Sequence, residues 1–112
     1  MADSQEYVQI LTTTEYKDDA SKIARQVVEG RLAACVQIIG PITSTYWWDD
    51  AVQEDEEYLC LIKSRADRVA QLKQTIAEVH PYDVPELLVV PVLDGGTDYL
   101  EWISEQVRPS DA

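Results

Sequence analysis

The sequence predicts an α+β fold in a single domain. Two observations predict this class: runs rich in β-branched residues alternate with segments whose apolar residues recur at helical spacing, and no linker, repeat or low-complexity stretch interrupts the alternation. With 112 residues, the chain is long enough to bury one core. We therefore expect one domain over residues 1–112, with a core at about 7–107 and flexible tails at 1–6 and 108–112.

The first half of the chain favours a strand, a helix and a long strand. Residues 7–14 (YVQILTTT) are rich in β-branched residues, as strands are. Apolar residues spaced by three and four then predict a helix that Asp18 caps and Gly30 ends. Residues 33–39 and 42–48 are two strand-like halves, and the proline between them predicts a bulge within one long strand.

A turn at residues 49–51 opens the second half of the chain. Residues 52–63 then return as a second long strand and complete a hairpin. Ser64 and Asp67 have the spacing of a capping box, and they precede an amphipathic helical pattern over residues 69–79 that a His-Pro pair ends.

The last elements are a short strand and a helix. Residues 87–92 are apolar and predict a strand that tolerates an internal proline. After a Gly-Gly turn, Thr97 can cap a final helix whose apolar side includes Trp102 and Val107. The order is therefore βαββαβ followed by a helix, which favours a ferredoxin-like sandwich: a four-stranded antiparallel sheet with both main helices on one face.

The central hairpin is too long for a compact monomer. Its arms run about a dozen residues each, against a usual ~5–6, so the distal half projects beyond the helices. That half carries Tyr46, Trp47 and Trp48, and large aromatic residues on a projecting ribbon favour pairing with another chain. The alternative is that the last helix folds back over them. We favour a homo-oligomer, because one short helix cannot cover both faces of the ribbon.

Charge and composition exclude several classes of partner. The chain has 21 acidic and 9 basic residues and a formal charge of −12, which repels nucleic acid and anionic lipid surfaces and attracts cations. No stretch approaches the ~20 apolar residues of a membrane span, and the N-terminus lacks the basic and apolar regions of a secretion signal. We expect a cytoplasmic protein.

The two cysteines are predicted to be reduced. With the turn at residues 49–51, Cys35 and Cys60 lie four or five positions apart along the hairpin, which is about 15 Å at ~3.3 Å per residue. That separation is beyond the reach of a disulfide. Both residues lie in apolar runs, so we interpret them as small buried hydrophobic residues and not as nucleophiles.

Charged residues on the second arm of the hairpin have several interpretations. Residues 54–57 (EDEE) are four successive carboxylates on a predicted strand, where acidic residues have poor propensity. Solvent exposure is the first explanation, a salt bridge to a neighbouring subunit the second, and ligation of a hard cation the third. Lys63 either extends along apolar surface with its ammonium in water or presents that ammonium to an anion.

The segment of residues 80–86 (HPYDVPE) is the best candidate for a functional loop. Its two prolines fix their own φ angles and restrict the residue before each, so the loop is stiff. It holds His80, Tyr82, Asp83 and Glu86 in place, and His80 is the only histidine. Two roles are open for His80: a metal ligand together with Asp83, or a cap of the second helix that hydrogen-bonds within the loop.

Catalytic signatures are absent from the sequence. It has no Gly-x-Ser-x-Gly elbow, no phosphate-binding Gly-rich loop, no His-Glu-x-x-His and no Cys-x-x-Cys pair. We therefore expect a protein that is not an enzyme, with a hydrolase as the remaining enzymatic alternative.

Several segments match a known family in order along the chain. They are Leu32-Ala33-Ala34-Cys35-Val36, Tyr46 and Trp48 before the turn, Lys63-Ser64 after the hairpin, His80-Pro81-Tyr82 with Pro85-Glu86, and Tyr99-Leu100-x-Trp102. Over roughly residues 7–107 the chain resembles the CutA divalent-ion tolerance proteins. The resemblance implies a homotrimer with no required cofactor, a part in tolerance of copper and other divalent cations, and an architecture similar to the trimeric nitrogen-signalling proteins.

The resemblance also implies a site. The residues carried over to a cleft between subunits are Trp48, Lys63, Tyr82 and Glu86, with His80 beside them. Copper ligands proposed in the family are a Cys in the first strand and a His pair before the proline, and Thr12 and Val79 stand at those positions here. Two ligand classes are thus open: a divalent cation held weakly by His80 and Asp83, or an anionic metabolite held by Lys63 and the stiff loop.

Overall fold

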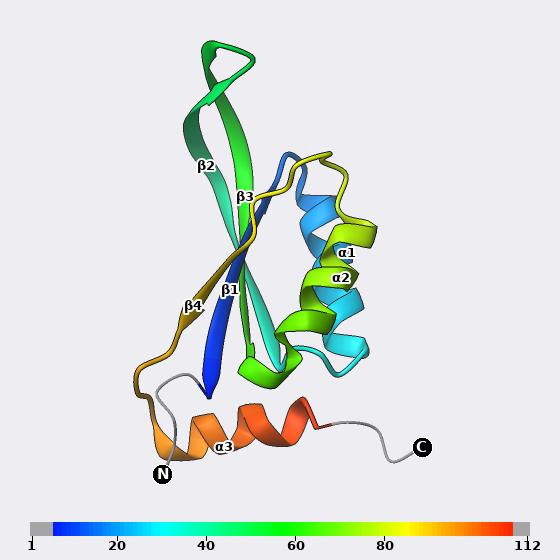
Figure 1. Ribbon diagram of the computed structural model, residues 1–112, viewed down its shortest axis with the longest axis vertical. Helices are drawn as coiled ribbons and strands as arrows, with labels where there is room; N and C mark the ends of the chain where they lie inside the picture. Colours follow the sequence, from blue (N-terminus) through cyan, green and yellow to red (C-terminus); the bar gives the residue numbers. More distant parts are fainter. Residues whose placement is uncertain (1–5, 109–112) are drawn as a thin grey trace.

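The computed structural model describes residues 6–108, and its elements follow one another in the predicted order (Figure 1). The elements of this part of the chain are β1 (Tyr7–Thr14), α1 (Lys17–Glu29), β2 (Cys35–Trp48), β3 (Ala51–Arg65), a short 3-10 turn (Ala66–Arg68), α2 (Val69–Val79), β4 (Leu88–Pro91) and α3 (Thr97–Gln106). Their bounds lie within a few residues of those predicted from the sequence.

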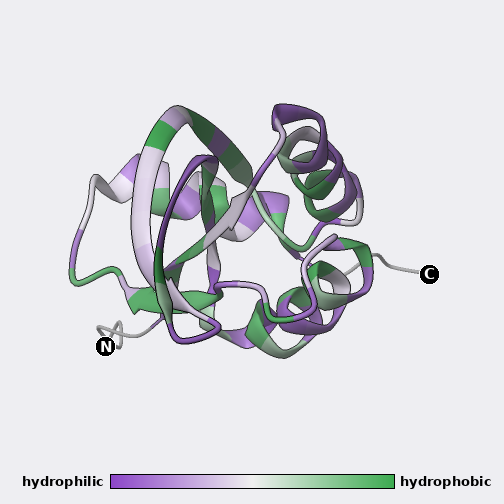
Figure 2. Ribbon diagram, turned by 90° about the horizontal axis from the view of Figure 1, so that it is seen from above, coloured by the Kyte–Doolittle hydropathy of each residue, from purple (hydrophilic) through white to green (hydrophobic). Residues whose placement is uncertain are grey.

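The strands form one four-stranded sheet in the order β2-β3-β1-β4, and each neighbouring pair is antiparallel. Both α1 and α2 lie on the same side of this sheet, and hydrophobic and hydrophilic residues alternate along them (Figures 1 and 2). The α+β fold with a four-stranded antiparallel sheet is therefore confirmed.

The core fills the space between the sheet and these two helices. Alternate residues of each strand point toward the helices, because successive side chains of a strand face opposite ways. Full burial of one such aliphatic side chain stabilises the fold by roughly 1.5–3 kcal/mol. The fully buried side chains of this core are Ile10 of β1, Ala20, Ile23 and Val27 of α1, Cys60 and Ile62 of β3, and Leu72 and Ile76 of α2.

The hairpin of β2 and β3 is paired from Cys35 opposite Lys63 to Trp48 opposite Ala51, except at Gly40 and Pro41. Its turn residues Asp49 and Asp50 have φ angles of 56° and 60°, the left-handed geometry of a tight hairpin turn that Asp tolerates better than most residues. A shift of register between Ile39 and Ile42 places the irregularity where the proline predicted a bulge.

The last helix does not cover the aromatic half of the hairpin. Figure 1 shows α3 across the end of the sheet that is opposite the hairpin tip. Tyr46, Trp47 and Trp48 are accordingly exposed, at 39%, 74% and 54% of their surface. The alternative in which the last helix folds back over these residues is therefore wrong.

A cluster around Arg65 holds α3 in that position. The Arg65 guanidinium donates to Ser104 Oγ at 2.7 Å and pairs with the Glu6 carboxylate at 2.8 Å. Tyr7 reaches Ser104 at 2.7 Å from the next strand. Glu6 is thus bound to the fold, although the sequence placed it in a flexible tail; the remaining tail residues, 1–5 and 109–112, lie outside the described part of the chain.

The helix starts differ from the sequence predictions. Tyr16 and not Asp18 occupies the N-cap of α1, and Gly96 and not Thr97 that of α3. Ser64 does not cap α2, because β3 continues through it and its hydroxyl donates to the Leu32 carbonyl at 2.6 Å. Ser64, which the capping pattern assigned to the start of the helix, is thus part of β3, and a 3-10 turn connects β3 to α2.

The prediction that both cysteines are reduced was right, but the predicted register was wrong, and so was the burial of Cys35, which is partly exposed. Cys60 pairs with Ile38, so the two cysteines are three positions apart along the hairpin, about 10 Å at ~3.3 Å per residue. An odd separation also places them on opposite faces of the sheet. Both are free, and burial raises the pKa of the Cys60 thiol to about 11, so that thiol is unreactive at neutral pH.

Among the described helices, none has the length and apolar character needed to cross a membrane.

Candidate functional site

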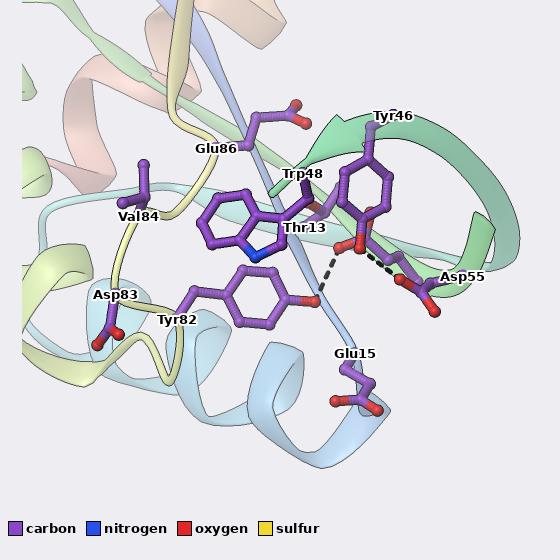
Figure 3. A pocket seen from close by; sticks show the side chains of 10 residues that line it. Thr13, Glu15, Tyr46, Trp48, Asp55, Tyr82, Asp83, Val84 and Glu86 are labelled. Carbon is purple, nitrogen blue, oxygen red and sulfur yellow. Dashed lines mark hydrogen bonds between the residues drawn. The ribbon is translucent and has the colours of Figure 1, made fainter. Parts of the chain in front are cut away.

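A cavity of about 400 Å³ opens between the hairpin, the end of β1 and the loop that joins α2 to β4 (Figure 3). Each of these three segments contributes side chains to its wall. The lining residues are Thr13 of β1 and Glu15 just after it, Tyr46, Trp48, Asp55 and Glu57 of the hairpin, and Tyr82, Asp83, Val84 and Glu86 of the loop.

His80 fixes the loop to the end of β1. The imidazole is 8% exposed, its Nδ1 accepts the backbone N–H of Tyr82 at 3.1 Å, and its Nε2 lies 2.8 Å from the Thr13 carbonyl oxygen. Since Nδ1 accepts, the ring proton is on Nε2, which donates to that carbonyl. The ring also packs against Tyr82 at 4.8 Å between centroids. His80 therefore lies behind the cavity wall and positions Tyr82 within it.

Two phenols of the wall donate to carboxylates of the hairpin. The Tyr82 hydroxyl donates to Glu57 at 2.8 Å, and the Tyr46 hydroxyl donates to Asp55 (Figure 3). The hydrogen bond to Asp55, then burial, raises the pKa of Tyr46 to about 12. Burial, then the bond to Glu57, raises the pKa of Tyr82 as well. Both phenols stay protonated at neutral pH, which keeps the two carboxylates in place.

The cavity is strongly acidic. Five of its lining residues are carboxylates, and no lysine, arginine or histidine of residues 6–108 lines it. Within the same range, no hydrogen bond or ion pair holds the carboxylates of Glu15, Asp83 or Glu86. Because these side chains all carry negative charge and line a concave site, they create a negative electrostatic potential in the cavity. The cavity therefore attracts cations and repels anions.

The structure brings together most of the residues predicted for the cleft. Trp48, Tyr82 and Glu86 line the cavity, and Asp83 joins them. Lys63 does not, because it lies six residues along β3 from Glu57, about 20 Å at ~3.3 Å per residue, and its ammonium donates to Gln37 Oε1 at 2.7 Å. An anionic metabolite would therefore find no basic group in this cavity within the described chain.

Sequence reasoning missed Glu15 and Thr13 as lining residues. Asp55 and Glu57 belong to the acidic run, and their two-residue spacing could have placed both on one face of the strand. No signal in the sequence links Glu15 to the loop. The other carboxylates of the run, Glu54 and Glu56, are exposed, in line with the first of the three explanations.

A metal site is not complete in one chain. Among the described residues, no three His, Cys, Asp or Glu side chains are grouped closely enough to hold a metal ion. His80 could bind a metal only by losing one of its two hydrogen bonds. Thr12, where the family resemblance suggested a ligand position, is fully buried on the helix side of the sheet. The role of His80 and Asp83 as metal ligands stays a prediction that this geometry does not favour.

Comparisons with known proteins agree with the fold and with the sequence motifs. Residues 8–106 match the family described as CutA1 divalent ion tolerance protein. The divalent-cation tolerance protein CutA of Thermus thermophilus is 41% identical over 96 residues, covering 86% of this chain and 93% of that protein. A crystal structure of CutA1 from Oryza sativa superposes with a TM-score of 0.90 at 34% identity, covering 96% of this chain and 100% of that one.

Other relatives are longer than this chain. The chloroplastic CutA 1 protein of Oryza sativa subsp. japonica is 37% identical over 101 residues, which are 90% of this chain and 57% of that protein. The matched segments of the mouse and human proteins are 49% and 48% of those proteins. The chain thus spans about half the length of these relatives.

Proposed function

The chain belongs to the CutA1 divalent ion tolerance family, and we propose that it acts as a non-enzymatic, trimeric, cytoplasmic protein in the response to divalent metal ions. The observation that carries this proposal is the cavity with five carboxylates and no basic lining residue within residues 6–108. Such a site favours cations of any kind. Within residues 6–108 the cavity lining includes no serine, cysteine, histidine or lysine, which supports a binding role.

Assembly into a trimer is supported by surfaces that the single chain leaves uncovered. The aromatic residues of the projecting hairpin are exposed, as are Ile39, Leu88 and Val90 on the side of the sheet away from the helices. Both β2 and β4 are edge strands, whose free backbone groups can pair with another chain. The hairpin from Tyr46 to Glu57 is the part that would contact neighbours.

Metal binding would then depend on carboxylates brought together from more than one chain. Glu15, Asp83 and Glu86 are free to contribute, whereas His80 is engaged within its own chain. Oxygen ligands with little imidazole give a site of modest affinity that still prefers copper over zinc and manganese.

Calorimetric titration with copper, zinc and manganese salts tests this proposal. We expect saturable copper binding by the unmutated protein, weakened at least tenfold by Asp83→Asn with Glu86→Gln. The matched control is Glu101→Gln with Glu105→Gln, which removes the same charge from exposed positions on α3 and is expected to change affinity less than twofold. His80→Gln is expected to act less strongly than the carboxylate pair. Absence of saturable binding, or equal loss in the control, would overturn the metal proposal.

A further inference from the structure

The cavity has aromatic walls as well as acidic ones. Tyr46 and Trp48 come from β2, and Tyr82 comes from the loop after α2; Figure 3 shows the three rings around the same space. The hydroxyls of Tyr46 and Tyr82 are already donated to Asp55 and Glu57. What these residues offer to a ligand is therefore the faces and edges of their rings, and not their hydroxyls.

The carboxylates surround the space but do not converge on a point. Among the described residues no three of them are grouped closely enough for a metal ion, although five line the cavity. A small hard cation needs converging oxygens at short distance, while a larger cation whose charge is spread over an organic group needs only negative walls. Aromatic faces attract such a cation through their negative quadrupole.

We propose that this cavity binds a small organic cation, a primary amine or a quaternary ammonium. Trp48, Tyr46 and Tyr82 contact the cationic head, and the free carboxylates of Glu15, Asp83 and Glu86 balance its charge. The volume of about 400 Å³ is in the range of small-molecule sites, roughly 300–1,000 Å³. This inference rests on the same cavity as the proposed function and adds a ligand class that does not require the metal.

The same chemistry could come from a lysine or arginine side chain of a second copy of the chain. Both sources present an alkylated, charged nitrogen to rings and carboxylates. They differ in solution, because a free amine binds to the assembled protein, while an intersubunit side chain would already fill the cavity and would strengthen self-association.

Calorimetric titration with tetramethylammonium chloride and with 1,4-diaminobutane, in a buffer containing a metal chelator, tests the proposal. Ionic strength is held constant with sodium chloride, and sodium acetate serves as the anionic comparison. We expect saturable binding of at least one cation and none of acetate. Trp48→Leu should weaken binding at least tenfold, and Trp48→Phe should restore most of it. Trp102→Leu should change binding less than twofold, because Trp102 lies on α3 and does not line the cavity.

The carboxylates are tested with the same pair of charge variants used for metals. Asp83→Asn with Glu86→Gln should weaken organic-cation binding at least tenfold, and Glu101→Gln with Glu105→Gln less than twofold. Equal loss in both variants, or no saturable heat with either cation, would overturn the proposal. So would a protein that binds neither cation but self-associates less when Asp83 and Glu86 are neutralised, since the cavity would then hold a side chain of another copy. The chelator keeps a failure here separate from a failure of metal binding.

Discussion

A single imidazole connects three parts of the chain around the cavity. His80 ends α2, accepts from the Tyr82 backbone and donates to the Thr13 carbonyl at the end of β1. The two prolines restrict the backbone of the loop, and these two hydrogen bonds fix its position against the end of β1. The position of Tyr82, and through it the hydrogen bond to Glu57, therefore depends on a residue that does not line the cavity.

Replacing His80 by alanine is expected to destabilise the fold. The change leaves the buried Thr13 carbonyl without its donor and removes the acceptor of the Tyr82 N–H, a loss of about 1–3 kcal/mol. Urea unfolding followed by circular dichroism measures the change, with the exposed Lys73→Ala as the control. An effect no larger than that of Lys73→Ala would contradict the anchoring role.

The phenols of the cavity predict a loss of stability in alkali. The folded pKa of Tyr46 is about 12 against an ordinary value of 10.0, so folding favours the neutral phenol. This stabilisation is complete below pH 10 and is lost as the pH rises toward 12; the raised pKa of Tyr82 acts in the same direction. Unfolding midpoints between pH 9 and pH 12 should fall more steeply for the unmutated protein than for Tyr46→Phe with Tyr82→Phe. Parallel curves for the two proteins would contradict this account.

At the scale of elements, strands and helices followed from sequence pattern, while their junctions did not. Alternation and helical spacing are local, so β1, the hairpin and α2 could be predicted from consecutive residues. The role of Ser64 could not, because its capping pattern competes with a strand that is held by pairing to β1 and by the Leu32 carbonyl. The hairpin register was off by two positions. The turn uses two residues, Asp49 and Asp50, and not the three that were expected, and the bulge places Gly40 and Pro41 opposite Tyr58 alone.

The close contact at Gly40 gives a prediction for the hairpin. A Cβ atom at this position would collide with the ring of Tyr58 on the neighbouring strand. Gly40→Ala should therefore destabilise the protein by about 1–3 kcal/mol, the usual range for overpacking. Thermal unfolding of Gly40→Ala, Tyr58→Ala and the double variant should give a double loss smaller than the sum of the single losses. Strict additivity would show that the ring is not the cause.

At the scale of the whole molecule, the site joins segments that are far apart in sequence. The stiff loop and Trp48 were predicted as site residues, and the cavity contains both. Glu15 was not, because nothing local relates the end of β1 to residues 82–86. Lys63 was assigned through the family resemblance to a cleft between subunits, a location that a single chain does not contain. In this chain it lies near the other end of β3, where it donates to Gln37.

Assembly is expected to depend on the aromatic residues of the hairpin. Trp47→Ala with Trp48→Ala should weaken or abolish the trimer, since burying each ring against a neighbour contributes several kcal/mol at ~25 cal/mol per Å². Light scattering across a dilution series measures the state of association. Tyr16→Ala, which removes an exposed ring outside the hairpin, is the control and should leave it unchanged. A monomeric unmutated protein, or a double variant that assembles normally, would contradict the prediction.

The acidic run of β3 has a consequence for the time between synthesis and association. Along the distal hairpin, Glu54, Asp55 and Glu56 lie opposite Thr45, Ser44 and Thr43, next to the exposed tryptophans. Before association, each chain thus exposes a two-stranded ribbon with apolar side chains and a free strand edge. Such an edge can pair with other chains and start aggregation. Repulsion between these carboxylates opposes stacking of one ribbon on another in register. The charges that weaken the strand would thereby protect unassembled chains from aggregation.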